Sequence, residues 1–334
     1  MFEKIFVESD ILALPFTQNL LSKFAKTPIE TIDKVENYWG RVKKPYLQKR
    51  ETLNLYIGKK LGNLIKKAPQ AYGTQNGLHY YFIHAYNCIY ECQYCYLQGY
   101  FQTPDIVLFV NHDEIIAQMK NLLIENPNED IWFHAGEYSD SLALSHITEE
   151  LPLYWKFFKE HPRAKLELRT KSANIKALSN LAPLSNIFVS FSLSPEQEIK
   201  DYDLKTAGLK ARLNAISTLA QAGHQIGIHL DPIILGDNTL LHYEKLLEQL
   251  KSTLDWNQLA YISLGVVRFT KDVYREIEHN YPDSKLHAQE FITSFDGKVR
   301  YPKPIRMKVL KQIQGLCLAA GIAAEKIYLC MEDN

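Results

Sequence analysis

From residue 79 onward, short apolar segments alternate with longer segments of helical periodicity, and this alternation limits the folds open to the chain. The apolar segments are rich in β-branched and aromatic residues and short enough for buried parallel strands. They span residues 79–85, 130–135, 165–170, 186–193, 225–234 and 260–267. Helical patterns lie between them at 113–126, 142–159, 173–181, 205–222 and 240–253. Six β/α units in series predict an α/β fold with a parallel sheet curled into a whole or partial barrel, although doubly wound sheets share this alternation.

Nearly every expected strand ends in a polar side chain. The residues at these ends are His84, His134 to Glu137, Thr170, Lys171, Ser192, Ser194, His229, Asp231 and Arg268. Strands commonly end in polar loops, and this ordinary explanation would account for one or two polar strand ends. It accounts less well for polar residues at all six. In β/α barrels the carboxyl ends of the strands build the active site. We therefore expect a catalytic site at this edge of the sheet.

The composition fits a large folded domain, and we expect a cytoplasmic protein. The chain has 334 residues, of which 46% are hydrophobic, and this is enough for a sizeable core. No apolar run reaches the ~18 residues that a membrane span needs, and the first residues, MFEKIFVESDILALPF, do not resemble a signal peptide. Thiols stay reduced in the cytoplasm, so the five cysteines indicate a metal site or catalysis rather than a disulfide framework.

Positive charge gathers in the first part of the chain although the net charge is zero. Residues 1–80 hold 13 Lys and Arg against 7 Asp and Glu, and residues 40–67 alone hold nine basic residues and one acid. A basic stripe that also carries aromatic rings can follow a phosphate backbone. A solvated surface would have the same composition, and the neutral total argues against strong nonspecific affinity for DNA.

Three cysteines stand in the stretch AYNCIYECQYCYLQ, directly after the first expected strand. Cys88, Cys92 and Cys95 follow the spacing Cys-x3-Cys-x2-Cys, which lets one loop present three soft thiolate ligands. A structural zinc ion takes four ligands, and His84 would complete such a set. A 4Fe–4S cluster held by three cysteines instead leaves one iron open to a substrate or cofactor. The residues alone leave both kinds of metal site open.

The cysteine spacing and its place after the first strand resemble the signature of radical S-adenosylmethionine (radical SAM) enzymes. Further stretches resemble the spore photoproduct lyase family of that superfamily: CQYCYLQ, FHAGEYSD, RTKS, VSFSLS and RFTKDVYREIEHNYPDSKL. The resemblance extends from about residue 53 to the C-terminal region. It implies a partial (β/α)6 TIM-like barrel at 79–270, with a basic N-terminal segment at 1–78 and a C-terminal hairpin and helix extension at 271–334.

The resemblance also implies two cofactors and the residues that bind them. Cys88, Cys92 and Cys95 match the family's ligands of a 4Fe–4S cluster, whose open iron is chelated by S-adenosylmethionine. Lys171 matches a lysine that holds the cofactor, and an ammonium group suits the S-adenosylmethionine carboxylate. Ser192 matches a serine near the same cofactor.

Two departures from the family pattern concern the return of a hydrogen atom to the product. The spore enzymes carry a cysteine for this step where this chain has Glu137, and Gly136 with Glu137 resembles the Gly-Gly-Glu element that binds the methionyl ammonium group. Tyr94 and Tyr96 match a tyrosine pair implicated in relaying a hydrogen atom, although packing at the barrel mouth would also account for them. The terminal stretch YLCMEDN offers the Cys330 thiol as a substitute donor, with burial as a small hydrophobic residue as the alternative.

The stretch TSFDGKVRYPKPIR is the candidate DNA-contacting element. Asp296-Gly297 between two short strand-like runs predicts a hairpin. Lys298, Arg300 and Arg306 would give this stretch positive charge, and Tyr301 would give it a stacking surface. In the family, a basic hairpin near this place wedges into the damaged duplex. An ordinary surface hairpin is an equal interpretation of the sequence alone.

The resemblance as a whole implies a radical SAM lyase of the DNA repair type. Such an enzyme uses a 5′-deoxyadenosyl radical to repair thymine photodamage. Its partners would be DNA containing damaged thymine and an electron donor such as flavodoxin or ferredoxin, with no membrane involved. Two alternatives are a radical SAM enzyme of the same fold with another nucleic-acid or small-molecule substrate, and a zinc-stapled nucleic-acid-binding protein.

Overall fold

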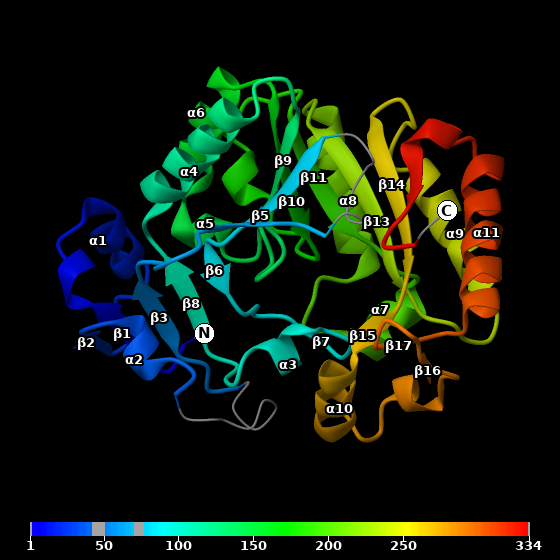
Figure 1. Cartoon of the computed structure of the whole chain (residues 1–334). Helices are drawn as coiled ribbons and strands as arrows, with labels where there is room; N and C mark the ends of the chain where they lie inside the picture. Colours follow the sequence, from blue (N-terminus) through cyan, green and yellow to red (C-terminus); the bar gives the residue numbers. More distant parts are fainter. Residues whose placement is uncertain (1, 42–50, 70–76, 333–334) are drawn as a thin grey trace.

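A computed structural model describes residues 2–41, 51–69 and 77–332, and its larger sheet is the predicted parallel one (Figure 1). In spatial order its strands are β18 (Ile327–Leu329), β14 (Leu259–Val266), β13 (Gln225–Ile233), β11 (Ile187–Ser192), β10 (Ala164–Thr170), β9 (Ile131–His134), β5 (Leu78–Phe82) and β4 (Ile65–Lys67). Neighbouring strands are parallel from β18 to β5, and β4 pairs antiparallel with β5. The sheet curls into a half-barrel, so the predicted fold is confirmed, with β18 as an additional parallel strand.

A smaller sheet stands on the N-terminal side of the half-barrel (Figure 1). In order its strands are β2 (Ile29–Ile32), β1 (Ile5–Glu8), β3 (Leu55–Gly58), β8 (Ile106–Phe109) and β6 (Ala85–Tyr86). The basic N-terminal segment thus contributes three strands of a sheet that also draws two strands from beyond residue 79. Residues 42–50 of the basic stretch lie outside the described residues.

The remaining strands of the described residues form two small antiparallel sheets. The first joins β7 (Glu91–Cys92) to β12 (Asp203–Leu204), and the second joins β15 (Arg268–Thr270), β17 (Lys298–Arg300) and β16 (Ile292–Thr293). β16 and β17 form the hairpin predicted around Asp296-Gly297, and Gly297 has the positive φ of 77° that such a turn requires.

Helices cover the convex side of the half-barrel and flank the smaller sheet (Figure 1). The α-helices are α1 (Pro15–Ser22), α2 (Val35–Tyr38), α3 (Leu97–Tyr100), α4 (His112–Glu125), α5 (Ser145–Thr148), α6 (Leu151–Glu160), α7 (Glu196–Tyr202), α8 (Leu209–Gln221), α9 (Thr239–Lys251), α10 (Lys271–Asn280) and α11 (Lys303–Ala319). Single 3-10 turns lie at Ser9–Ile11, Lys176–Leu178, Lys285–Ala288 and Ala324–Lys326. No helix among the described residues is long and apolar enough to cross a membrane.

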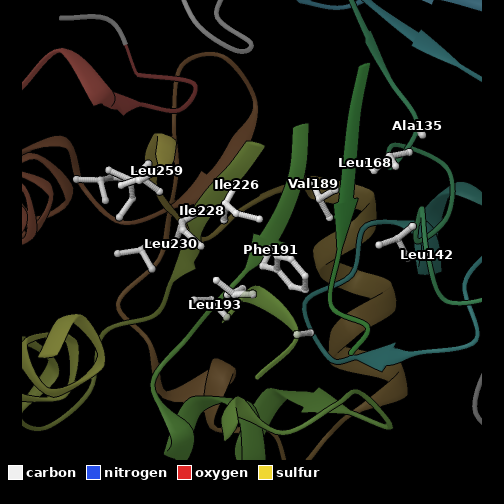
Figure 2. Packing of buried hydrophobic residues seen from close by; sticks show 14 of the residues in the cluster. Ala135, Leu142, Leu168, Val189, Phe191, Leu193, Ile226, Ile228, Leu230 and Leu259 are labelled. Carbon is white, nitrogen blue, oxygen red and sulfur yellow. The ribbon is translucent and has the colours of Figure 1, made fainter. Parts of the chain in front are cut away.

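Apolar and polar side chains alternate along the strands of the half-barrel, so its outer face is apolar and its inner face is polar. On β10, Leu166 and Leu168 are buried in the main hydrophobic core, whereas Glu167 and Arg169 point to the other face and make polar contacts across the hollow. Figure 2 shows the apolar side chains of β10, β11 and β13 gathered in this core. The outer face therefore packs the half-barrel against its helices and leaves the inner face for chemistry.

Two predicted helices differ from what the structure has. The pattern at 142–159 is split into α5 and α6, because Glu149 between them adopts a left-handed conformation with φ 54°. The pattern at 173–181 forms only the 3-10 turn Lys176–Leu178. There the Ser172 hydroxyl and the Asn174 carboxamide accept hydrogen bonds from following backbone N–H groups, which competes with helix formation.

Candidate active site

The three motif cysteines lie on the loop that leaves the first barrel strand at its carboxyl end. Cys88 follows β6, Cys92 ends β7, and Cys95 precedes α3. β7 pairs antiparallel with β12, and this pairing places Cys92 opposite Asp203. One loop therefore presents all three thiols at the edge of the sheet where the sequence predicts the active site.

The loop is held in place by its own polar side chains. The buried carboxamide of Asn87 donates to the carbonyls of Thr103 and Asp105 at 2.7 and 2.8 Å. The Gln98 carboxamide donates to the Gln93 carbonyl at 2.8 Å and accepts from Asn280 at 2.9 Å. These bonds satisfy buried polar groups at both ends of the loop, and none of them uses a cysteine thiol.

The thiol chemistry of the loop suits an iron–sulfur cluster, and two contacts describe its surroundings. The backbone N–H of Tyr90 donates to Cys88 Sγ at 3.4 Å, and such bonds stabilise sulfur ligands of iron. His84, the fourth ligand that a zinc site would need, instead donates from Nε2 to the Ala135 carbonyl at 3.1 Å. Burial lowers the pKa of His84 to about 4. This bond engages Nε2 alone, and histidines that bind a metal commonly donate their second ring nitrogen to a carbonyl in this way, so the contact does not separate the two kinds of site. Among the described residues no three of these side chains are gathered as a ready metal site, and the role of the three cysteines as cluster ligands remains a prediction.

Lys171 stands over the cysteine loop, and Asp140 fixes its position. The Asp140 carboxylate accepts from the Lys171 backbone N–H at 2.7 Å and from the Thr170 hydroxyl at 2.6 Å. The Lys171 ammonium lies 5.4 Å from the centroid of the Tyr94 ring in the loop. Sequence reasoning missed Asp140, although this acid closes the stretch FHAGEYSD and joins it to the stretch RTKS.

Glu137 faces the hollow of the half-barrel just beyond β9. Burial raises the pKa of this carboxyl, while Arg169, a hydrogen bond from Tyr96, and Arg268 oppose the rise. A half-buried carboxylate facing cations can bind a further ammonium group when one of these partners moves away. The role of Glu137 in binding the methionyl ammonium group remains a prediction.

Gly136 and Ser192 both contact Arg169. A Cβ atom on Gly136 would lie 3.0 Å from Arg169 Cβ and 3.1 Å from the Arg169 carbonyl oxygen, so glycine permits this close approach of β9 and β10. The buried Ser192 hydroxyl accepts from Arg169 Nε at 3.2 Å. Ser192 therefore lies at the mouth as predicted from its strand position, and its contact with the cofactor remains a prediction.

The two tyrosines of the motif have different surroundings. The Tyr94 hydroxyl donates to the Asp203 carboxylate, which also pairs with buried Arg212 at 3.0 Å. Tyr96 has an exposed ring and donates to Glu137. Tyr94 is therefore fixed by its bond to Asp203, whereas Tyr96 lies closer to the polar groups at the carboxyl edge of the half-barrel. The relay role of the pair remains a prediction.

Cys330 lies at the carboxyl edge of the sheet, directly after β18. The strand joins the sheet beside β14 rather than folding over the mouth, and the Cys330 backbone N–H donates to the Leu264 carbonyl at 2.8 Å. Its buried thiol lies 3.5 Å from Arg268 Nη2. Arg268 pairs with both oxygens of Asp231 at 3.2 and 3.3 Å. Burial, followed by the negative charge of Asp231, raises the pKa of the Cys330 thiol to about 12, so this thiol keeps its hydrogen at neutral pH.

A second polar layer lies deeper in the half-barrel and was not anticipated. The Glu167 carboxylate accepts hydrogen bonds from His134, Ser190, His229 and Tyr261. Burial would raise the pKa of Glu167, but the two histidines outweigh this effect and hold it well below its usual value. His134 and His229 belong to this layer rather than to the rim. The signal in the sequence was a polar residue at every second position of KLELRT.

The hairpin does not present the side chains that the sequence suggested. Tyr301 is buried and donates to the Gln289 carboxamide at 2.7 Å, so the prediction that it is a stacking surface is wrong. Arg300 is also buried and pairs with Asp296 at 2.8 Å, so it is not a free surface cation. Lys298 is half-buried. The side chain that does project from the tip is Phe295, which is fully exposed.

Comparison with known proteins agrees with this architecture. A family model for spore photoproduct lyase matches residues 1–304. The chain belongs to the spore photoproduct lyase family. It is 28% identical to spore photoproduct lyase of Bacillus subtilis (strain 168) over 296 residues, which are 86% of this chain and 84% of that relative. It is 22% identical to the Clostridium acetobutylicum protein of the same name over 310 residues, 91% of this chain and 90% of the relative.

Solved structures of spore photoproduct lyase share the fold over the whole chain. A variant with bound AdoMet and dinucleoside spore photoproduct superposes with a TM-score of 0.85 at 22% identity, covering 100% of this chain and 99% of the other. A second, complexed with dinucleoside spore photoproduct, has a TM-score of 0.84 at 21% identity and covers 98% of each chain. The resemblance inferred from the motifs is therefore confirmed, and the family is one of radical SAM enzymes that use a 4Fe–4S cluster and S-adenosylmethionine.

Proposed function

We propose that this protein is a radical SAM lyase that repairs the spore photoproduct, a thymine dimer, in DNA. The observation that carries the proposal is the meeting of a three-cysteine loop with Lys171 and Glu137 at the carboxyl edge of the half-barrel, in a member of the spore photoproduct lyase family. Relatives of this name match most of the chain. A solved structure that shares its fold holds AdoMet and the dinucleoside lesion.

The residues of this chain would hold the two cofactors in complementary ways. Cys88, Cys92 and Cys95 would each bind one iron of the cluster, and Lys171 and Glu137 would face the carboxylate and ammonium groups of S-adenosylmethionine. When bound, the cofactors supply one-electron cleavage of S-adenosylmethionine and so an oxidant that removes a hydrogen atom from the lesion. The walls of the half-barrel would keep water and competing hydrogen donors away from that site.

The proposal is tested by anaerobic incubation of the reconstituted protein with S-adenosylmethionine, a reductant and dinucleoside spore photoproduct. We expect repaired thymine to form only when S-adenosylmethionine and the reductant are both present. Cleavage of S-adenosylmethionine with no repaired thymine, on dinucleoside or on DNA, would instead indicate another substrate on the same fold. Using reduced flavodoxin or ferredoxin in place of the chemical reductant tests the inferred electron donor. Absence of turnover with both proteins would show that neither is the donor.

Changing Lys171 to alanine should weaken S-adenosylmethionine binding while the cluster stays intact. The change removes one charge-assisted contact, worth roughly 1.5–3 kcal/mol, or about ten- to a hundredfold in affinity. Glu137→Gln should weaken binding in the same direction. Equilibrium binding to the reconstituted protein measures the effect, and Lys176→Ala removes an exposed lysine five residues away as the matched control. Unchanged affinity in Lys171→Ala would show that the assigned role is wrong.

We infer that Cys330 returns the hydrogen atom to the repaired thymine. Its S–H bond would break, the hydrogen would form a C–H bond on the product radical, and a thiyl radical would remain on Cys330. The thiyl radical would regain a hydrogen atom from deoxyadenosine, directly or through Tyr96. A buried, protonated thiol beside Arg268 and Asp231 at the carboxyl edge supports this assignment.

Phe295 at the hairpin tip would enter the damaged duplex beside the lesion. Apolar side chains inserted between base steps unstack them, and base–aromatic stacking is worth about 1–3 kcal/mol per base. Phe295→Ala should therefore weaken binding of lesion-containing duplex about tenfold, measured by fluorescence anisotropy, while turnover of the dinucleoside stays unchanged. Phe295→Trp retains an aromatic ring and should bind like the wild type. Equal duplex affinities of the alanine variant and the wild type would remove the hairpin from the proposal.

A further inference from the structure

Lys60 follows strand β3 of the smaller sheet, and Lys66 lies in β4, an edge strand of the half-barrel. Neither lysine belongs to the groups described above. Lys66 is the central residue of β4 and pairs with Tyr81 on β5, and residues paired across a ladder point to the same face of the sheet. The Tyr81 ring lies 6.1 Å from the ring of His134, which bonds to Glu167 inside the half-barrel, so the Tyr81 side chain faces the hollow. Lys66 therefore projects on the inner face, whereas its neighbour Lys67 projects outward.

Among the described residues, the Lys66 ammonium is positioned by an aromatic ring rather than by a carboxylate. It lies 5.2 Å from the centroid of the Tyr138 ring, and Tyr138 directly follows Glu137. A cation–π contact positions an ammonium group without a conventional acceptor for its three N–H bonds. Within the part of the chain that the structure describes, neither Lys60 nor Lys66 forms a salt bridge to a carboxylate.

Lys60 brings a second positive charge close to Lys66. Burial lowers the pKa of Lys60, the charge of Glu36 opposes this effect, and the charge of Lys66 adds a smaller lowering. The Lys60 ammonium donates to the Leu61 carbonyl, which holds it in the loop that follows β3. Two ammonium groups that repel each other are a favourable place for an anion, because the anion relieves the repulsion.

An aromatic surface adjoins the two lysines. The Tyr100 and Tyr138 rings lie 5.7 Å apart, and Tyr100 is 52% exposed at the end of α3. Helix α10, which leads toward the hairpin, packs against α3, and the smaller sheet lies on the other side of α3 in Figure 1. The Lys60–Lys66–Tyr100 surface and the hairpin therefore flank the cysteine loop from two sides.

We propose that Lys60, Lys66 and Tyr100 form a second contact with DNA, which holds the phosphate backbone on the side of the mouth opposite the hairpin. The proposal rests on the proposed function, since it names how that site takes a lesion within a strand. Paired cations next to an exposed aromatic ring suit a polynucleotide, whose phosphates and bases alternate along the strand. A dinucleoside lesion lacks the flanking phosphates and would not need this surface.

The test compares Lys60→Gln/Lys66→Gln with the wild type in binding to fluorescein-labelled duplex that contains one spore photoproduct, over a series of salt concentrations. Each lost phosphate contact should reduce the slope of log K against log [salt] by about 0.9. We expect the slope of the double variant to fall by the equivalent of one to two phosphate contacts. Tyr100→Leu should lose affinity with little change in slope. Turnover of dinucleoside spore photoproduct should remain at the wild-type rate in both.

Lys67→Gln is the matched control, because it removes a lysine from the same strand on the opposite face. A wild-type slope in the double variant would overturn the proposal. An equal loss of slope in Lys67→Gln would also overturn it, because the effect would then be one of overall charge. If the wild type does not turn over the dinucleoside but the slopes differ as expected, the proposed substrate fails while the DNA-binding surface stands.

Discussion

Replacing any one of Cys88, Cys92 and Cys95 with alanine will remove the visible absorption of the anaerobically reconstituted protein and its reductive cleavage of S-adenosylmethionine. Thiolate is the ligand that iron–sulfur clusters require, and alanine offers no atom that could take its place. The loop brings no further cysteine that could substitute, since the other two are Cys317 in α11 and Cys330 after β18. We therefore expect loss to background rather than a graded decrease.

The control for this experiment is Cys317→Ala. Cys317 is fully buried in α11 and packs in the main core, so its removal tests for unspecific effects of losing a thiol. This variant should keep both the absorption and the cleavage. Full cleavage activity in any variant of the three motif cysteines would contradict the assignment of the cluster ligands.

Cys330→Ser should uncouple the two products of the reaction. The serine O–H bond is much stronger than the thiol S–H bond, so the variant can no longer return a hydrogen atom to the thymine radical. The serine hydroxyl can still contact Asp231 and Arg268, so the pairing of these residues at the rim should persist. We expect deoxyadenosine to accumulate, because no thiyl radical takes its hydrogen atom back, while repaired thymine falls and adducts of the trapped product radical appear in the nucleoside analysis.

The readout separates a donor from a structural thiol. A structural role would lower deoxyadenosine and thymine together, whereas a donor changes their ratio. Cys317→Ala should leave the ratio at its wild-type value. If repaired thymine is unaffected by Cys330→Ser, direct return of the hydrogen atom from deoxyadenosine or from Tyr96 becomes the better account.

The half-barrel could be predicted because each of its strands and helices is marked by a short continuous stretch of sequence. Each inner strand is a short run of β-branched and aromatic residues, and the glycine at the end of ARLNAISTLAQAG marks the helix stop, where Gly223 has a φ of 92°. The three cysteines could be singled out as candidate ligands because they lie within eight residues. Local pattern is sufficient wherever the partners are close in sequence.

The remainder depended on contacts between distant residues. Tyr94 meets Asp203, and Glu167 meets His229 and Tyr261, through pairings that no single segment encodes. In the hairpin, a charge pattern suggested a basic surface, but Arg300 turns toward Asp296 and Glu332 while Tyr301 packs inward. Side-chain direction in so short a hairpin is set by what covers it, and the sequence of the hairpin does not contain that information.

The bonds of Asn87 and Gln98 mean that assembly of the cofactor is separable from folding. Many small metal-binding domains are unfolded until the metal arrives, because their ligands have no other support. Here the ligand loop is closed by carboxamide bonds and by the β7–β12 pairing, and no cysteine thiol takes part in these bonds. The iron-free protein should therefore protect the Gln93 and Cys95 amides from hydrogen exchange, since both N–H groups donate to backbone carbonyls.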